Sequence, residues 1–170
     1  DRKPRVVLGV DPGTALLGFG VVRWTAGEPL DYVSCGVVAT VSSQSLPHRL
    51  HRLYRELGLV IDTYGVTELA VEQVFFQRNV RTAFAVGQAR GVVLLAAAER
   101  NLPVAEYTPL EVKQAVTSYG RASKSQVQEM VRLLLGLDAP PRPDDAADAL
   151  ALAICHARRC EQADLMRRAG

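Results

Sequence analysis

Short apolar runs separated by turn-forming residues dominate the first forty positions. Residues 5–11, 17–24 and 32–40 are rich in valine, leucine and aromatic side chains, which is typical of β-strands. Pro12-Gly13 and Glu28-Pro29 mark turns between these runs. Because the connections are short, the pattern predicts an antiparallel meander of three strands.

Beyond residue 40 the pattern alternates between helical and strand periodicity. Leucines at positions 46, 50, 53 and 57 form one apolar stripe, which predicts an amphipathic helix over residues 46–64. The later predictions are strands at 68–72 and 103–106 and helices at 80–100, 109–117, 123–135 and from 144 onward. The order βββαβαβ followed by helices predicts an α/β fold with a mixed five-stranded sheet flanked by helices. We expect one domain spanning residues 1–170.

Composition indicates a globular protein rather than a secreted or membrane protein. Of the 170 residues 22% are charged, and no uninterrupted apolar run approaches the roughly 20 residues of a membrane span. Cys35, Cys155 and Cys160 form no CxxC pair, which favours reduced thiols. No signal-peptide pattern is recognisable, and we expect a cytoplasmic location without membrane contact.

The net charge of +2 says little, but its distribution is uneven. Residues 75–132 carry eight Lys/Arg against four Glu, whereas residues 138–148 carry four Asp against one Arg. A basic band beside an acidic cluster suits a polyanion held against metal ions, although solvated helix faces would account for about half of the basic residues. The basic residues that we consider for nucleic-acid binding are Arg78, Arg81, Lys113, Arg121 and Lys124.

Four carboxylates interrupt segments that are otherwise apolar. Asp11 ends the first strand, Glu72 ends the fourth, and Asp145 and Asp148 open the apolar helical run from residue 149. A charge in such a place is costly unless it is paired or binds a metal. Strands that run side by side could bring Asp11 and Glu72 to the same end of the sheet. Hard oxygen ligands in this number suit Mg²⁺ or Mn²⁺ and two-metal phosphoryl chemistry.

Spacing alone does not choose between the acids of the last helix. Asp145 and Asp148 are separated by three residues and Asp144 and Asp148 by four, so either pair projects from one helix face. A purely structural role is also possible, because acids near a helix N-terminus are stabilised by the helix dipole and Asp144 could be an N-cap.

The segment from Asp11 to Gly18 permits a different reading. Its small residues could let the backbone approach a nucleotide phosphate, as in actin-like ATPases. However, no Gly-Lys-[Ser/Thr] sequence follows, and 170 residues leave no room for the second domain that such ATPases require.

Taken together, these residues resemble the RuvC family of Holliday junction resolvases, crossover junction endodeoxyribonucleases of bacteria. The resemblance covers nearly the whole chain. The blocks that carry it are Gly9-Val-Asp-Pro-Gly13, Gly18-Phe-Gly-Val-Val22, Val71-Glu-Gln-Val-Phe75, Gly87-Gln-Ala-Arg-Gly91, Val112-Lys-Gln114, Lys124-Ser-Gln-Val127 and Asp145-Ala-Ala-Asp-Ala-Leu-Ala-Leu-Ala153.

The resemblance implies an RNase H-like fold and paired nicking of four-way DNA junctions with Mg²⁺, two ions per active site, for which Mn²⁺ could substitute. It also implies a homodimer, a branch-migration helicase complex as partner, and roles in DNA recombination and repair. Asp11, Glu72, Asp145 and Asp148 match the family's catalytic, metal-binding acids. Three further residues match the family's site: Lys113 and Lys124 among its basic residues, and Phe75 as an aromatic beside the junction.

The helix at 80–100 offers a candidate dimer surface. It is apolar nearly all round, which is simplest to bury if one side meets the sheet and another meets a partner. The alternative is that this face packs only on its own sheet. The candidate interface residues lie near one helix face and are Ala83, Gly87, Arg90, Gly91 and Leu94.

Two other functions compete with junction resolution. The first is another RNase H-like nuclease acting on branched DNA or on RNA–DNA hybrids. The second is a non-catalytic junction-binding protein, which four intact acids disfavour.

Overall fold

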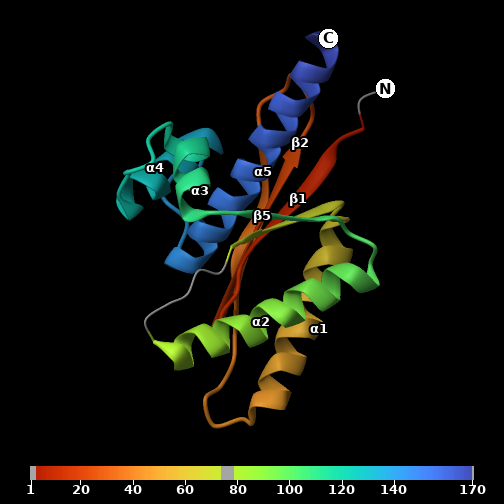
Figure 1. The fold of residues 1–170 in the computed structure, drawn as a ribbon, viewed down its shortest axis with the longest axis vertical. Coiled ribbons are helices and arrows are strands. Elements are labelled where there is room, and N and C mark those ends of the chain that lie inside the picture. Colours follow the sequence, from red (N-terminus) through yellow and green to blue (C-terminus); the bar gives the residue numbers. More distant parts are fainter. Residues whose placement is uncertain (1–2, 74–78, 170) are drawn as a thin grey trace.

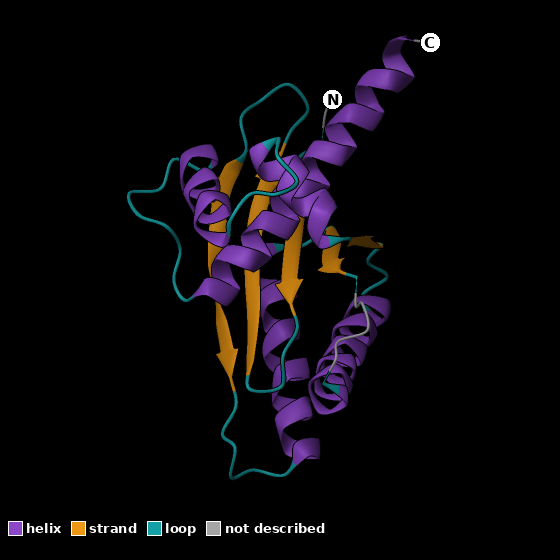
Figure 2. Cartoon of the chain, turned by 60° about the vertical axis from the view of Figure 1, so that its left-hand side comes forward, coloured by secondary structure: helices purple, strands orange, loops and turns teal. Residues whose placement is uncertain are grey.

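A five-stranded mixed sheet with helices on both faces forms the centre of the molecule (Figures 1 and 2). The computed structural model describes residues 3–73 and 79–169. The sheet order is β3-β2-β1-β4-β5. The strands are β1 (Arg5–Asp11), β2 (Leu16–Trp24), β3 (Asp31–Ala39), β4 (Glu68–Glu72) and β5 (Val104–Tyr107).

The helices occupy the predicted segments, with ends that differ by one residue at most. The predicted capping box of α4 is present, since the Ser123 hydroxyl accepts from the Gln126 amide at 3.2 Å. The final helix begins at Asp144 itself, so the interpretation of Asp144 as an N-cap is wrong. The helices are α1 (Leu46–Tyr64), α2 (Val80–Glu99), α3 (Pro109–Thr117), α4 (Lys124–Leu134) and α5 (Asp144–Ala169).

Strand pairing confirms the antiparallel meander of β1, β2 and β3. After α1, β4 returns parallel to β1 with Val10 paired to Val71, and β5 then pairs parallel to β4. Parallel strands expose their carboxyl ends at the same edge of a sheet. The residues that follow this pair, Asp11 and Glu72, therefore leave the sheet side by side, as the sequence predicted.

The side chains of β1 alternate between two hydrophobic cores. Leu8 and Val10 face α1 and α2, whose buried residues include Leu57 and Val93. Val7 faces the other way, toward α3, α4 and α5. Figure 1 shows the same division, with α1 and α2 together on one side of the sheet and α5 crossing the other. By the same alternation, Asp11 lies on the α5 side.

Helix α2 is unusually apolar. Within the described residues it is the one helix long and hydrophobic enough to cross a membrane by length and composition alone. No uninterrupted apolar run of that length is present, because Arg81 and Arg90 interrupt the helix, but its valines and alanines raise the mean hydropathy enough to meet this measure. In the structure, Ala89, Val93 and Ala96 are instead fully buried in the core beneath the sheet.

Helix α5 lies exceptionally close to β1 and β2. A Cβ atom at Gly9 would stand 1.9 Å from the Ala149 carbonyl oxygen, and one at Gly18 would stand 2.2 Å from the carbonyl oxygen of Asp145. Alanines supply the helix side of the contact, and Ala149 and Ala153 are fully buried. Glycine facing alanine therefore sets the distance between the sheet and α5.

We predict that Gly9→Ala is strongly destabilising. Its Cβ would meet the backbone of α5 rather than a flexible side chain, so the helix has to shift and its packing with β1 and β2 is disturbed. We expect a loss of about 2 kcal/mol or more in the free energy of unfolding, measured by urea denaturation.

Gly87→Ala is the matched control. Nothing lies within 4 Å of a Cβ at Gly87, which is inside α2. Within one subunit, alanine there should stabilise the helix by about 0.5–1 kcal/mol, and the denaturation is followed at a protein concentration low enough to keep the chain monomeric. An unchanged unfolding midpoint for Gly9→Ala would contradict the close contact with α5.

Candidate active site

Three elements far apart in the sequence bring carboxylates to one place. Asp11 is the last residue of β1, Glu72 is the last residue of β4, and Asp148 lies in the second turn of α5. Adjacent parallel strands place the first two acids side by side, and the close packing of α5 brings the third over them. The predicted juxtaposition of Asp11 and Glu72 with the α5 acids is therefore present in the fold.

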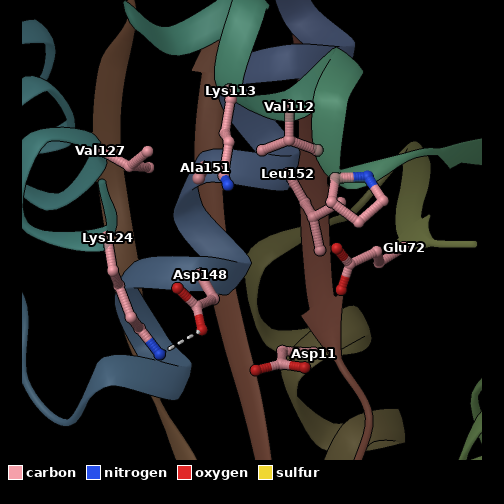
Figure 3. A pocket seen from close by; sticks show the side chains of 10 residues that line it. Asp11, Glu72, Val112, Lys113, Lys124, Val127, Asp148, Ala151 and Leu152 are labelled. Atoms are coloured by element: carbon pink, nitrogen blue, oxygen red, sulfur yellow. Dashed lines mark ion pairs between the residues drawn. The ribbon is translucent and has the colours of Figure 1, made fainter. Parts of the chain in front are cut away.

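These acids line a pocket of about 260 Å³ between the sheet, α3, α4 and α5. Figure 3 shows the carboxylates of Asp11, Glu72 and Asp148 turned toward a common space, with Lys113 reaching in from α3. Lys124 approaches from α4 and pairs with Asp148 at 3.2 Å. The remaining lining residues are apolar and form one wall of the pocket: Pro109, Val112, Val127, Ala151 and Leu152.

This apolar wall was not identified from the sequence. Its members read as ordinary core positions of three amphipathic helices, and no local signal separates them from other buried residues. The wall limits water access to the acids and lowers the local dielectric.

Among the pocket acids, Asp11 has the largest shift in pKa. Burial raises the pKa of Asp11 to about 7, and the negative charges of Asp148, Asp145 and Glu72 act in the same direction. Lys124 opposes this shift only in part. A carboxyl group with a pKa of about 7 is only about half ionised at neutral pH, and a nearby cation would favour its ionised form.

The two other pocket acids follow the same pattern. Burial and then the charge of Asp148 raise the pKa of Glu72, while Lys113 lowers it. Burial also raises the pKa of Asp148, against the pull of the hydrogen bond and charge of Lys124. The pocket therefore combines three acids of raised pKa with two lysines, so its acidic groups outnumber its basic groups.

The structure separates Asp144 from Asp145. The Asp144 carboxylate accepts hydrogen bonds from Gln128 at 3.0 Å and from Arg142 at 2.9 Å, and these partners together with Lys124 hold its pKa below the usual range. It is not among the charges that raise the pKa of Asp11, whereas Asp145 is. The side of α5 that bears Asp145 and Asp148 therefore acts on Asp11, while Asp144 is engaged with α4 and Arg142.

Two of the remaining DNA-binding candidates, Arg81 and Arg121, lie outside the pocket. Both are exposed, at the start of α2 and in the connection before α4. Phe75 and Arg78 fall outside the described residues.

Arg90 has a different environment from the other candidates for the dimer surface. Its side chain is only 14% exposed, pairs with Glu106, and donates to the Glu72 backbone carbonyl at 2.9 Å. The guanidinium turns toward the ends of β4 and β5, while a place for Arg90 in a dimer interface stays a prediction. Within its own subunit, Arg90 holds the backbone from which Glu72 projects, a role that periodicity alone did not indicate.

The other candidates on α2 lie along an exposed apolar stripe. Gly87 and Gly91 have open space where a Cβ would stand, and Leu94 is 36% exposed. Phe84 and Leu95 extend the stripe and are 69% and 56% exposed. Ala83 is half-buried at its margin. The opposite side of α2 packs in the core, so the helix is apolar both inside and outside.

The nucleotide-phosphate interpretation of the first turn finds no support in the geometry. The space in front of Gly18 is filled by the backbone of Asp145 on α5. A phosphate could not approach the strand there without displacing the helix.

The donor set fits a hard divalent cation. Asp11, Glu72 and Asp148 offer carboxylate oxygens from rigid elements, and a bound cation would offset the burial that is the main cause of their raised pKa values. Oxygen-only ligands of this kind suit Mg²⁺ or Mn²⁺ rather than Zn²⁺.

Comparison with known proteins identifies the family of this chain. The family model described as crossover junction endodeoxyribonuclease RuvC matches residues 7–156. The chain is 59% identical to crossover junction endodeoxyribonuclease RuvC of Rubrobacter xylanophilus over 153 residues, which cover 90% of this chain and 85% of the relative. The RuvC of Thermomicrobium roseum is 56% identical over 161 residues, covering 95% of this chain and 98% of the relative.

Solved structures agree with the sequence comparison. The chain superposes on Thermus thermophilus RuvC in complex with a Holliday junction substrate with a TM-score of 0.89 and 39% identity, covering 94% of this chain and 96% of that chain. The predicted RNase H-like α/β fold is confirmed. Matched by its family model over most of its length and more than half identical to curated members, this chain belongs to the RuvC family of crossover junction endodeoxyribonucleases.

Proposed function

We propose that this protein is a cytoplasmic endonuclease, formed by one RNase H-like domain, that resolves four-way DNA junctions in recombination and repair. One observation carries the proposal: the acids of β1, β4 and α5 converge on one pocket bordered by two lysines, in a chain of the RuvC family. The phosphodiester backbone of DNA suits a pocket that combines cation-binding acids with lysines.

In this proposal Asp11, Glu72, Asp145 and Asp148 hold two Mg²⁺ ions, for which Mn²⁺ could substitute. When bound, such ions lower the pKa of a water nucleophile and stabilise the leaving oxygen of the phosphodiester. The protein supplies ligands fixed on β1, β4 and α5, so the carboxylates need little reorganisation as charge develops.

The two lysines complete the charge balance. Lys124 is paired with Asp148 and Asp144 at 3.2 and 3.6 Å. If these acids took up cations, the Lys124 ammonium would be released to pair with a DNA phosphate. Lys113 enters from α3 and would offset negative charge on the scissile phosphate. Arg81, Arg121, Phe75 and Arg78 would extend contact to the DNA arms.

A homodimer matches the substrate's symmetry, since a four-way junction offers two equivalent strands for cutting. The exposed stripe on α2 is the surface that we assign to the partner subunit. Phe84, Leu94 and Leu95 supply apolar area, while Gly87 and Gly91 permit close backbone approach. Family membership adds a branch-migration helicase complex as the expected partner.

Replacing one of the four proposed metal-binding acids by its amide should abolish cleavage but spare junction binding. We expect Glu72→Gln and Asp145→Asn to lower the cleavage rate at least about 10³-fold, on the order of 4 kcal/mol of transition-state stabilisation. The assay compares a labelled four-way junction with a linear duplex, an RNA–DNA hybrid and ATP, each with Mg²⁺. Selective cutting of the junction supports the proposal, and preference for any other substrate contradicts it.

Asp144→Asn is the matched control for the neighbouring acid. Its carboxylate is engaged by Gln128 and Arg142, so its loss should change cleavage less than about tenfold. A Glu72→Gln enzyme that cuts at nearly the parent rate would remove Glu72 from the site.

The raised pKa of Asp11 predicts that the metal-free fold loses stability as pH rises. With a pKa of about 7 in the folded state against 3.8 when unfolded, the folded chain retains a proton that the unfolded chain loses between these values. Stability contributed by this group is present below pH 4 and is lost by pH 7. In EDTA at pH 8, the free energy of unfolding of Asp11→Asn should therefore be larger than that of the parent by on the order of 1–2 kcal/mol, a figure reduced to account for screening by solvent.

Urea denaturation at pH 4.5 and pH 8 provides the measurement. The advantage of Asp11→Asn should shrink at the lower pH, and Mg²⁺ at pH 8 should stabilise the parent more than the variant. Equal stability of the two proteins in EDTA at pH 8 would contradict the electrostatic account.

Gly91→Glu should yield a folded monomer. The position is exposed with open space around it, so the charge is tolerated within one subunit but not at an apolar interface. Sedimentation should show a dimer for the parent and a monomer for the variant, with loss of paired nicking. A dimeric Gly91→Glu protein would move the interface away from α2.

A further inference from the structure

A second cluster of potential metal ligands lies away from the active site. Glu68 begins β4, four residues before Glu72, while His156 and Cys160 lie one turn apart on α5. The Glu68 Oε2 atom lies 2.6 Å from His156 Nε2 and 3.8 Å from Cys160 Sγ, and the latter two atoms are 3.6 Å apart. Carboxylate, imidazole and thiol thus converge within 4.8 Å of one another.

These distances approach the edges of a tetrahedron around a transition-metal ion. Metal–nitrogen and metal–oxygen bonds of about 2.0 Å and a metal–sulfur bond of about 2.3 Å imply separations of about 3.5 Å to sulfur and about 3.3 Å between nitrogen and oxygen. The two separations that involve Cys160 already match within about 0.3 Å. Only the Glu68–His156 hydrogen bond has to open, by about 0.7 Å.

Neighbouring residues already orient two of the three ligands. The Tyr107 hydroxyl lies 2.7 Å from His156 Nδ1, so this contact can fix the tautomer that leaves Nε2 free for a metal. Arg5 holds the other Glu68 oxygen, Oε1, at 3.3 Å. Around metal-binding histidines and carboxylates, one atom of the side chain binds the metal while another is held by a hydrogen bond or ion pair from a neighbouring residue.

Access is compatible with a bound ion. The His156 and Glu68 side chains are 11% and 16% exposed, and Cys160 is half-buried. A fourth position toward solvent can therefore be taken by water. Nitrogen and thiolate donors distinguish this cluster from the oxygen-only active site and favour Zn²⁺ over Mg²⁺.

We propose that Glu68, His156 and Cys160 form a Zn²⁺-class site that fastens α5 to β4. Binding displaces the thiol proton of Cys160 and the proton shared by Glu68 and His156 to solvent, and water completes the four ligands. The same two elements carry Asp148 and Glu72 at the active site. Tyr107, which orients His156, also pairs with Glu72 in the sheet. The ion would therefore reinforce the register on which the pocket depends.

Co²⁺ titration tests the site directly, because a thiolate ligand gives cobalt a near-ultraviolet charge-transfer band that carboxylates alone do not. The Asp11→Asn protein is the parent, so that binding at the active-site pocket is weakened. We expect one equivalent of Co²⁺ to produce the band and Zn²⁺ to displace it, with a rise in melting temperature. Absence of the band would overturn the proposal and leave a hydrogen-bonded cluster only.

Variants assign the ligands. Cys160→Ser should abolish the band, and Glu68→Gln should weaken Co²⁺ binding at least tenfold. Cys155→Ser is the matched control, because Cys155 lies on the same helix but contacts the Glu111 carbonyl. The cobalt band of this variant should be the same as that of the parent. A band that persists in Cys160→Ser, or disappears in Cys155→Ser with the fold intact by circular dichroism, would place the thiolate elsewhere.

Discussion

The contact between α5 and the sheet is the constraint on which the rest of the structure depends. Gly9 and Gly18 leave no side chain between the strands and the helix, so backbone meets backbone at Ala149 and Asp145. This contact brings the acids of α5 within electrostatic range of Asp11, although more than a hundred residues separate them in the chain. A looser helix would still bury apolar area, but it would not bring the charges together.

Concentrating these charges costs stability. The pocket acids have raised pKa values because burial and mutual repulsion disfavour their ionised forms, and the two lysines compensate only in part. Elsewhere in the described chain, Asp62 is paired in the ordinary way, with Arg100 at 2.8 Å. Local destabilisation of this kind is characteristic of sites that bind an ion or perform chemistry. The well-packed cores on both faces supply the stability that offsets it.

Periodicity and turn residues were sufficient to predict every helix and strand of the described chain and the parallel pairing that joins Asp11 to Glu72. The contacts that the sequence did not reveal depend on the direction in which a side chain extends in the folded protein. Arg90 has the spacing of a surface residue, but its long side chain reaches back to the Glu72 carbonyl. The Glu68, His156 and Cys160 cluster was not identified because its members lie 88 and 92 residues apart across the β4–α5 contact. Helix spacing alone marks His156 and Cys160 as neighbours and says nothing of Glu68.

The Arg90 contact connects α2 to the end of β4 that carries Glu72. One side of the helix bears the exposed apolar stripe, and from another the Arg90 guanidinium holds the carbonyl of Glu72. A movement of the helix that accompanied covering of the stripe would also move this carbonyl. The free energy of covering the stripe would then be coupled to the position of Glu72.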